Sequence, residues 1–186
     1  MRLDDYWQFN NSKVFMTLRE TSADDSDKNC IQYMTASLAR VICFDLVKRE
    51  YLNSHGMSEE SAMSIDALFQ INTASKEDDF IYMVEFKNGE ILSRDIERKA
   101  RDSVLIYQSI TGTQLEDTRK HVNFILVYND QKHPMNYRDK RALAKASQGR
   151  EDFSRFGLHH LRGFCFKRVF VFDQNQFEKR IVPLIC

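Results

Sequence analysis

One eight-residue segment places the strongest restriction on how this 186-residue chain folds. It begins with five apolar or aromatic residues, 80–84, continues with Glu85-Phe86-Lys87, and is followed by the turn dipeptide Asn88-Gly89. Such a run, rich in β-branched and aromatic residues and closed by a turn signal, predicts a buried strand. Side chains alternate along a strand, so Glu85 and Lys87 share one face. Because buried charges are costly, this pair indicates either mutual pairing or a metal ion and a phosphate nearby.

A second apolar segment, 64–71, carries Asp66 and is separated from the first by the polar stretch 72–79. Two strands joined by a polar turn predict a hairpin, which would bring Asp66 beside Glu85. Two adjacent carboxylates bind Mg²⁺ or Mn²⁺, hard ions that prefer oxygen ligands and retain several waters. The backbone carbonyl of Phe86 would add another oxygen. The sequence therefore predicts a divalent-metal site at this strand end.

These residues resemble the motif of the PD-(D/E)XK, or restriction-endonuclease-like, nuclease superfamily. The resemblance rests on Ser64-Ile65-Asp66, on Val84-Glu85-Phe86-Lys87-Asn88-Gly89 ending an apolar strand, and on the ionic helix that follows. It covers roughly residues 31–172, and Ile65 stands where the family usually has proline. The resemblance implies that Asp66 and Glu85 hold the metal. It also implies that Lys87 orients the attacking water and offsets charge on the phosphate.

The same resemblance implies further site residues on two helices. The family often has a Glu near the metal on its first helix, and Glu50 matches that position. Members also often place a basic residue on the helix after the motif, where Lys99 and Arg101 are the candidates and Asp102 would orient either one. Solvent-exposed helical faces explain all of these residues equally well.

Apolar spacing elsewhere predicts an α/β fold with a mixed sheet and helices on both faces. The expected helices cover 28–53, 91–112, 137–147 and 174–180, and the expected strands cover 64–71, 80–87, 122–128 and 164–172. With the resemblance, this order implies a restriction-endonuclease-like three-layer core in one domain, 1–186. Residues 1–27 would form an N-terminal arm or edge strand. The family's strand before the aspartate has little room in 53–64, so the missing edge would come from 14–17.

Charge is distributed unevenly along the chain. Residues 1–97 hold 18 acidic and 10 basic side chains, whereas residues 98–186 hold 9 acidic and 17 basic ones. An acidic half followed by a basic half suits a metal site that faces a phosphate-binding surface. Arg138 and Arg141, on the basic helix, are candidate phosphate contacts. Charges spread over a solvated surface, and a plain solvated helix, are the alternatives.

Several classes of protein and site are disfavoured by the composition. The cysteines at 30, 43, 165 and 186 follow no metal-ligand spacing, which favours reduced thiols. His159-His160 has no partner spacing either. No apolar run approaches the roughly 18 residues needed to span a bilayer, and the polar N-terminus does not resemble a signal peptide. The acidic stretch 22–27 reads as a loop, with Asp27 capping the helix expected after it. We expect a cytoplasmic protein.

Three functions compete for these features. The first is a Mg²⁺- or Mn²⁺-dependent nuclease acting on DNA in preference to RNA, in phage defence, a mobile element or repair. A dimer would be needed for such a small nuclease to cut both strands. The second is a catalytically inactive nuclease-like fold that binds nucleic acid or a protein partner. The third is an ordinary interaction module in which Glu85 and Lys87 merely pair.

Overall fold

The fold is built on a six-stranded mixed sheet, seen in a computed structural model that describes residues 2–27, 29–71, 80–137, 139–141 and 155–185. The strand order is β1-β4-β5-β6-β7-β8. Neighbours from β1 to β6 are antiparallel, whereas β6, β7 and β8 run parallel. The strands are β1 Phe15–Thr17, β4 Arg40–Cys43, β5 Ala67–Ile71, β6 Phe80–Lys87, β7 Val122–Tyr128 and β8 Arg168–Asp173. The predicted α/β class with a mixed central sheet is confirmed.

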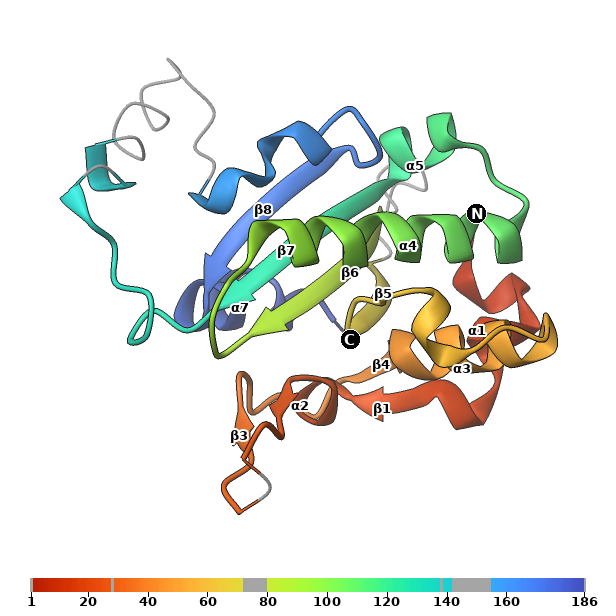
Figure 1. Ribbon diagram of the computed structural model, residues 1–186, viewed down its shortest axis with the longest axis horizontal. Coiled ribbons are helices and arrows are strands. Elements are labelled where there is room, and N and C mark those ends of the chain that lie inside the picture. The colour runs from red at the N-terminus through yellow and green to blue at the C-terminus, as the bar shows by residue number, and fades with distance from the viewer. Residues whose placement is uncertain (1, 28, 72–79, 138, 142–154, 186) are drawn as a thin grey trace.

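Helices cover both faces of this sheet, and a separate hydrophobic cluster fills each interface. Residues of α3 and α4 pack on one face, and residues of α2 and α7 pack on the other. Figure 1 shows α4 crossing the near face of β6 and β7, with α7 behind the sheet. The α-helices are α1 Trp7–Asn10, α2 Leu18–Thr21, α3 Phe44–Ser54, α4 Ser93–Thr111, α5 Leu115–His121 and α7 Gln174–Arg180. The 3₁₀ turns are η1 Leu3–Asp5, η2 Ser12–Val14, η3 Glu59–Ser61, η5 Arg155–Leu161 and η6 Val182–Leu184.

The helix α4 matches the prediction closely. Its buried side chains Ile96, Ala100, Val104 and Tyr107 recur at helical spacing and face the sheet. The helix ends where Gly112 adopts a left-handed conformation with φ of 69°, which glycine accepts without steric cost. The apolar spacing and the terminal glycine therefore both agree with the observed helix. Within the described chain, no helix has the length and apolar character needed to cross a membrane.

The long helix expected over 28–53 is wrong. The described part of that range holds β3 Gln32–Tyr33, then β4, and only then the helix α3. Two of the apolar residues that suggested one continuous stripe, Ile31 and Leu38, are 48% and 72% exposed. The run Val41-Ile42 is instead buried within the sheet, where β-branched side chains pack well. Asp27 accordingly caps no helix.

Strand β4 supplies the strand before Asp66 for which residues 53–64 left little room. It lies between β1 and β5, so the strand preceding Asp66 comes from the stretch expected to be helical. The edge strand anticipated at 14–17 is confirmed as β1, which pairs with β4. In a separate two-stranded hairpin, β2 Ala23–Asp24 lies in the stretch expected to be a loop, and its partner β3 lies in the stretch expected to be helical.

The C-terminal part also largely follows the sequence pattern. Strand β7 is confirmed and is buried along its whole length. Strand β8 is confirmed but begins at Arg168, four residues later than expected. The helix at 174–180 is confirmed as α7, capped by Asp173, whose Oδ1 accepts from Gln176 N at 2.7 Å. The helix predicted at 137–147 falls mostly outside the described residues.

Candidate functional site

Asp66 and Glu85 lie next to each other because β5 and β6 form the expected antiparallel hairpin. Ala67 pairs with Val84 in this hairpin. Asp66, which precedes Ala67, therefore lies beside Glu85, which follows Val84. The Asp66 N–H donates to the Val84 carbonyl at 3.0 Å, and the Asp66 carbonyl accepts from Phe44 N at 3.0 Å. The backbone of Asp66 is therefore held between β6 and the start of α3. The predicted proximity of Asp66 to Glu85 is confirmed.

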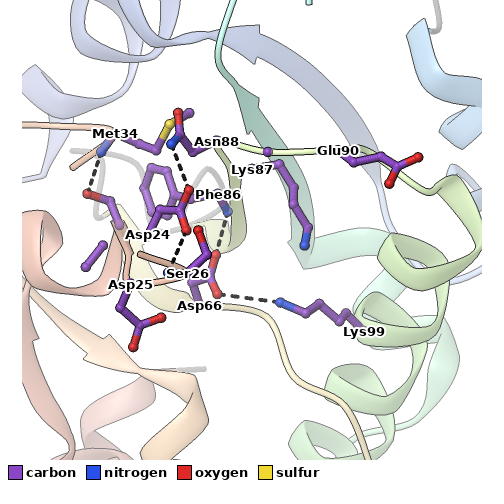
Figure 2. Close-up of a pocket in the computed structure, with 13 residues that line it drawn as sticks. Asp24, Asp25, Ser26, Met34, Asp66, Phe86, Lys87, Asn88, Glu90 and Lys99 are labelled. Atoms are coloured by element: carbon purple, nitrogen blue, oxygen red, sulfur yellow. Dashed lines mark hydrogen bonds and ion pairs between the residues drawn. The ribbon is translucent and has the colours of Figure 1, made fainter. Parts of the chain in front are cut away.

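Lys99 of α4 joins the two carboxylates. Its Nζ lies 2.7 Å from Glu85 Oε1. The same nitrogen lies 3.7 Å from Asp66 Oδ1, the ion pair drawn in Figure 2. The two carboxylate oxygens are thus no further apart than those two distances added together. The fully buried Ile96 and Ala100 press α4 onto the sheet on either side of this lysine. Its side chain is therefore directed at the carboxylates by the packing of the helix.

The four charged side chains of the candidate site differ in how far they are exposed to solvent. Glu85 is 0% exposed, Asp66 is 17% exposed and Lys99 is 20% exposed. Lys87 is 30% exposed, and its Nζ lies 3.9 Å from Glu85 Oε1. The predicted common face of Glu85 and Lys87 is confirmed. Lys87 is thus the most exposed of the four side chains, and Glu85 is the most buried.

Burial controls the protonation of the two carboxyls. Desolvation, helped by the charge of Asp66, raises the pKa of Glu85 to about 8. Desolvation also raises the pKa of Asp66 to about 6, although the Lys99 ammonium opposes the shift. Burial disfavours the charged form of Lys99, but the Asp66 and Glu85 charges outweigh it and hold the Lys99 pKa above its usual value. At neutral pH the two carboxyls together therefore retain a proton, which a divalent cation binding there would have to displace.

The donor set fits a hard divalent cation. Glu85 Oε2 is buried and has no hydrogen-bond partner among the described residues, whereas Asp66 Oδ2 accepts from Phe86 N at 2.5 Å. The Phe86 carbonyl belongs to the same strand end, and its role as a ligand stays a prediction. No group of three or more His, Cys, Asp or Glu in the described chain is arranged to hold a metal. Two carboxylates are enough for Mg²⁺, which usually keeps several waters.

Glu50 lies in a different part of the fold. It lines a separate cavity with Trp7 and Ser109, and its Oε1 lies 3.5 Å from Asn11 Nδ2. Ser109 is ten residues beyond Lys99, or about 15 Å along α4 at 1.5 Å per residue. The structure therefore does not bring Glu50 to the two carboxylates.

Asp45, which the sequence reasoning missed, is the acidic residue of α3 that lies near the site. Its Oδ1 accepts a hydrogen bond from the Ser64 hydroxyl. Its charge adds to the burial that raises the pKa of Asp66. Acidic residues favour the first turn of a helix, and the β-branched run ending at Cys43 marks where this helix begins. Those two signals would have identified Asp45.

The remaining basic candidates are not gathered at the carboxylates. Arg101 pairs with Glu97 at 3.8 Å, and its guanidinium lies 5.3 Å from the centre of the Phe164 ring. Residues two apart on a helix do not face each other, which separates Arg101 from Lys99. Asp102 accepts from Met63 N at 2.9 Å. Arg141 is exposed at the end of the described part of its segment, and Arg138 lies outside the described residues.

A cavity of 360 Å³ opens onto these residues. Asp66, Lys87 and Lys99 line it, together with the strand-end segment 86–90. Residues 22–26, from the acidic stretch read as a loop, form another part of the lining. The candidate site is thus an open cleft with the buried Glu85 beneath it.

Comparison of the chain with protein-family models, curated proteins and solved structures found no match. The superfamily resemblance of the motif stays a prediction.

Proposed function

We propose that this protein is a divalent-metal-dependent phosphodiesterase that hydrolyses nucleic acid, DNA in preference to RNA, in a restriction-endonuclease-like fold. The observation that carries the proposal is the buried Glu85 Oε2, which has no hydrogen-bond partner among the described residues and lies beside a second carboxylate. An unpartnered buried carboxylate oxygen is costly, and a cation removes that cost. Lys87 of β6 and Lys99 of α4, both paired with Glu85, supply positive charge for a phosphate.

Asp66 and Glu85 would hold Mg²⁺ or Mn²⁺, with the Phe86 carbonyl as a further oxygen. The ion would supply Lewis acidity, offsetting phosphate charge and making the attacking water more acidic. The Phe86 N–H fixes the Asp66 carboxylate by donating to its Oδ2. Asp66 is therefore oriented before any ligand arrives, which reduces the cost of assembling the site.

The two lysines would act differently. Lys87 stands at the mouth, where its ammonium can donate to a water or a phosphate oxygen and stabilise the charge that develops during hydrolysis. Lys99 lies deeper, and its bond to Glu85 keeps the two carboxylates together. Lys87 is thus the proposed catalytic residue, and Lys99 is a positioning residue.

A binding module without catalysis is the second candidate. Lys99 favours it, because its ammonium already pairs with both carboxylates and partly satisfies them without a metal. In that case the same fold would bind nucleic acid or a protein, and Lys87 would be one surface cation among others.

Metal titration by calorimetry, combined with cleavage of labelled DNA and RNA, separates the two candidates. The phosphodiesterase should bind Mg²⁺ or Mn²⁺, and Asp66→Asn and Glu85→Gln should abolish that binding. Lys87→Met should bind the metal but cleave about 100-fold more slowly, the size of effect seen when one charge-stabilising donor is lost. Glu116→Gln, on the exposed surface of α5, is the control and should behave as wild type. A wild-type protein that binds no metal and cleaves neither substrate would favour the binding module, and full activity in Lys87→Met would overturn the catalytic role of Lys87.

A further inference from the structure

The β2–β3 hairpin forms one wall of the cleft. Its two strands pair only with each other in the described chain and are not part of the six-stranded sheet. Residues 22–26 and Met34 nevertheless line the same cavity as Asp66 and Lys99. In Figure 2 the hairpin residues Asp24 and Asp25 lie across the cavity from Lys99.

The base of the hairpin is anchored in the core. Ser22 and Met34 are 2% and 3% exposed. The Ser22 hydroxyl oxygen accepts from Met34 N at 3.2 Å and from Thr35 N at 3.3 Å. Glu178 of α7 in turn accepts from the Thr35 hydroxyl and from Ala36 N. The two ends of the hairpin are therefore closed together against the body of the protein.

Asn88 fixes the strands of the hairpin above that base. Its Nδ2 donates to Asp24 Oδ2 at 2.7 Å and to Gln32 Oε1 at 2.8 Å, one acceptor on each strand. Its Oδ1 accepts from Asn129 Nδ2 at 2.7 Å, which sets the orientation of the amide. Asn88 is 5% exposed and directly follows Lys87. The hairpin is thus a wall held next to the proposed catalytic lysine.

The charged residues on the hairpin side of the cleft are acidic, whereas the opposite side carries both lysines together with Asp66 and Glu90. Asp24 and Asp25 stand on the hairpin side, and Lys87 and Lys99 stand on the opposite side (Figure 2). Hydrogen bonds from Ser26 and Asn88 hold the pKa of Asp24 below its usual value, so this carboxylate is ionised at neutral pH. A phosphate can lie against the lysines, but a second row of phosphates would meet the acidic wall.

The small size of the cleft also favours a single strand over a duplex. A cavity of 360 Å³ is near the lower end of the roughly 300–1,000 Å³ typical of small-ligand pockets. Duplex DNA carries a charge about every 1.7 Å of its axis, twice the density of one strand. A single strand instead turns its uncharged bases away from its phosphates, and carboxylates accept hydrogen bonds from base amino groups.

We propose that the β2–β3 hairpin makes the site selective for single-stranded nucleic acid, with the phosphate against Lys87 and a base against the hairpin. This inference rests on the proposed phosphodiesterase function. In this proposal Asp24 and Asp25 exclude a second strand. Asn88 positions the hairpin that carries them.

The test compares cleavage of one labelled oligonucleotide, free and annealed to its complement, in the presence of Mg²⁺. Wild type should cleave the single strand at least about tenfold faster, since like charges across an interface cost enough for such a ratio. The variant Asp24→Asn/Asp25→Asn keeps an acceptor for Asn88 while removing both charges, and it should lower that ratio about tenfold. The control Glu59→Gln/Glu60→Gln removes two charges from the exposed turn η3 and should leave the ratio unchanged.

Replacement of residues 23–33 by two glycines gives a second, independent variant, which should also cleave the duplex. Equal cleavage of both substrates by wild type, or an unchanged ratio in Asp24→Asn/Asp25→Asn, overturns the selectivity while the phosphodiesterase function stands. Failure of wild type to cleave either substrate overturns the proposed function, and the selectivity with it.

Discussion

Lys99 and Glu85 form the tightest ion pair of the candidate site, with 2.7 Å between Nζ and Oε1. The pair connects α4 to β6, two elements that are otherwise joined by apolar packing. The Glu85 side chain is 0% exposed, so a substitution of either residue should change the free energy of unfolding strongly.

Lys99→Met should lower the free energy of unfolding by about 3 kcal/mol, because it leaves two buried carboxyls without their cation. Urea unfolding at neutral pH measures this loss. Arg98→Met, on the exposed face of the same helix, is the matched control and should change stability by less than about 0.5 kcal/mol. Added Mg²⁺ should restore more stability to Lys99→Met than it adds to wild type. A variant as stable as wild type would show that Lys99 does not hold the carboxylates.

Glu85→Gln should flatten the pH dependence of stability. Because the folded-state pKa of Glu85 is raised from 4.5 to about 8, the folded protein binds more protons than the unfolded chain between these values. The contribution of Glu85 to stability is therefore fully present below about pH 4.5 and is lost as the pH rises through 8. Between pH 5 and pH 8, wild type should therefore lose at least about 1 kcal/mol more than Glu85→Gln. Parallel curves from urea unfolding would contradict the raised pKa.

Mg²⁺ should stabilise the wild-type protein more at pH 8 than at pH 6. Binding must remove the proton from Glu85, whose pKa is about 8, and low pH opposes that removal. At a concentration 100 times its dissociation constant, the metal should add about 2.7 kcal/mol. Thermal unfolding with and without Mg²⁺ measures the shift at each pH. Asp66→Asn should show no metal-dependent shift at either pH, and an equal shift in this variant would place the bound ion elsewhere.

Asn88→Ala should loosen the β2–β3 hairpin while keeping the main sheet intact. The substitution removes the donor shared by Asp24 and Gln32, which are held to the strand end by that amide. The expected loss of stability is about 1–3 kcal/mol, the cost of leaving buried polar partners unpaired. Amide hydrogen exchange should rise between residues 22 and 34 and stay unchanged in β6 and β7. Asn53→Ala, exposed on α3, is the control. Uniform exchange across the protein would show that Asn88 supports the whole fold instead.

Elements with a short-range pattern were predictable from the sequence. Strand β6 is bounded by its own apolar run and by Asn88-Gly89, and α4 by its buried stripe and Gly112. The same rule failed over 28–53, where residues buried on different faces of the sheet happen to fall at helical spacing. Met34 and Val41 pack on one face, whereas Ile42 packs on the other. Periodicity cannot separate a helix from short strands that contribute to two cores.

Some residues of the candidate site were likewise predictable from the sequence, and others were not. Glu85 and Lys87 followed from strand alternation, and Asp66 followed from the hairpin. The sequence did not predict Asp45, because the helix was expected to begin at residue 28 and α3 begins at Phe44. Glu50 was expected near the metal instead. The contact between Asp24 and Asn88 joins residues 64 positions apart. No local pattern encodes such a pair, so the wall of the cleft emerges only from the folded chain.

The hairpin of β5 and β6 has a practical consequence for engineering this protein. The site lies at one end of the hairpin, near Ala67 and Glu85, whereas Ile71 pairs with Phe80 at the other end. Glu85 lies five positions beyond Phe80 along the strand, a span of about 17 Å at 3.3 Å per residue. A fluorescent reporter or affinity module inserted between Ile71 and Phe80 would therefore join the protein at the end of the hairpin remote from the candidate site. Such a graft would leave Asp66, Glu85 and Lys87 unaltered.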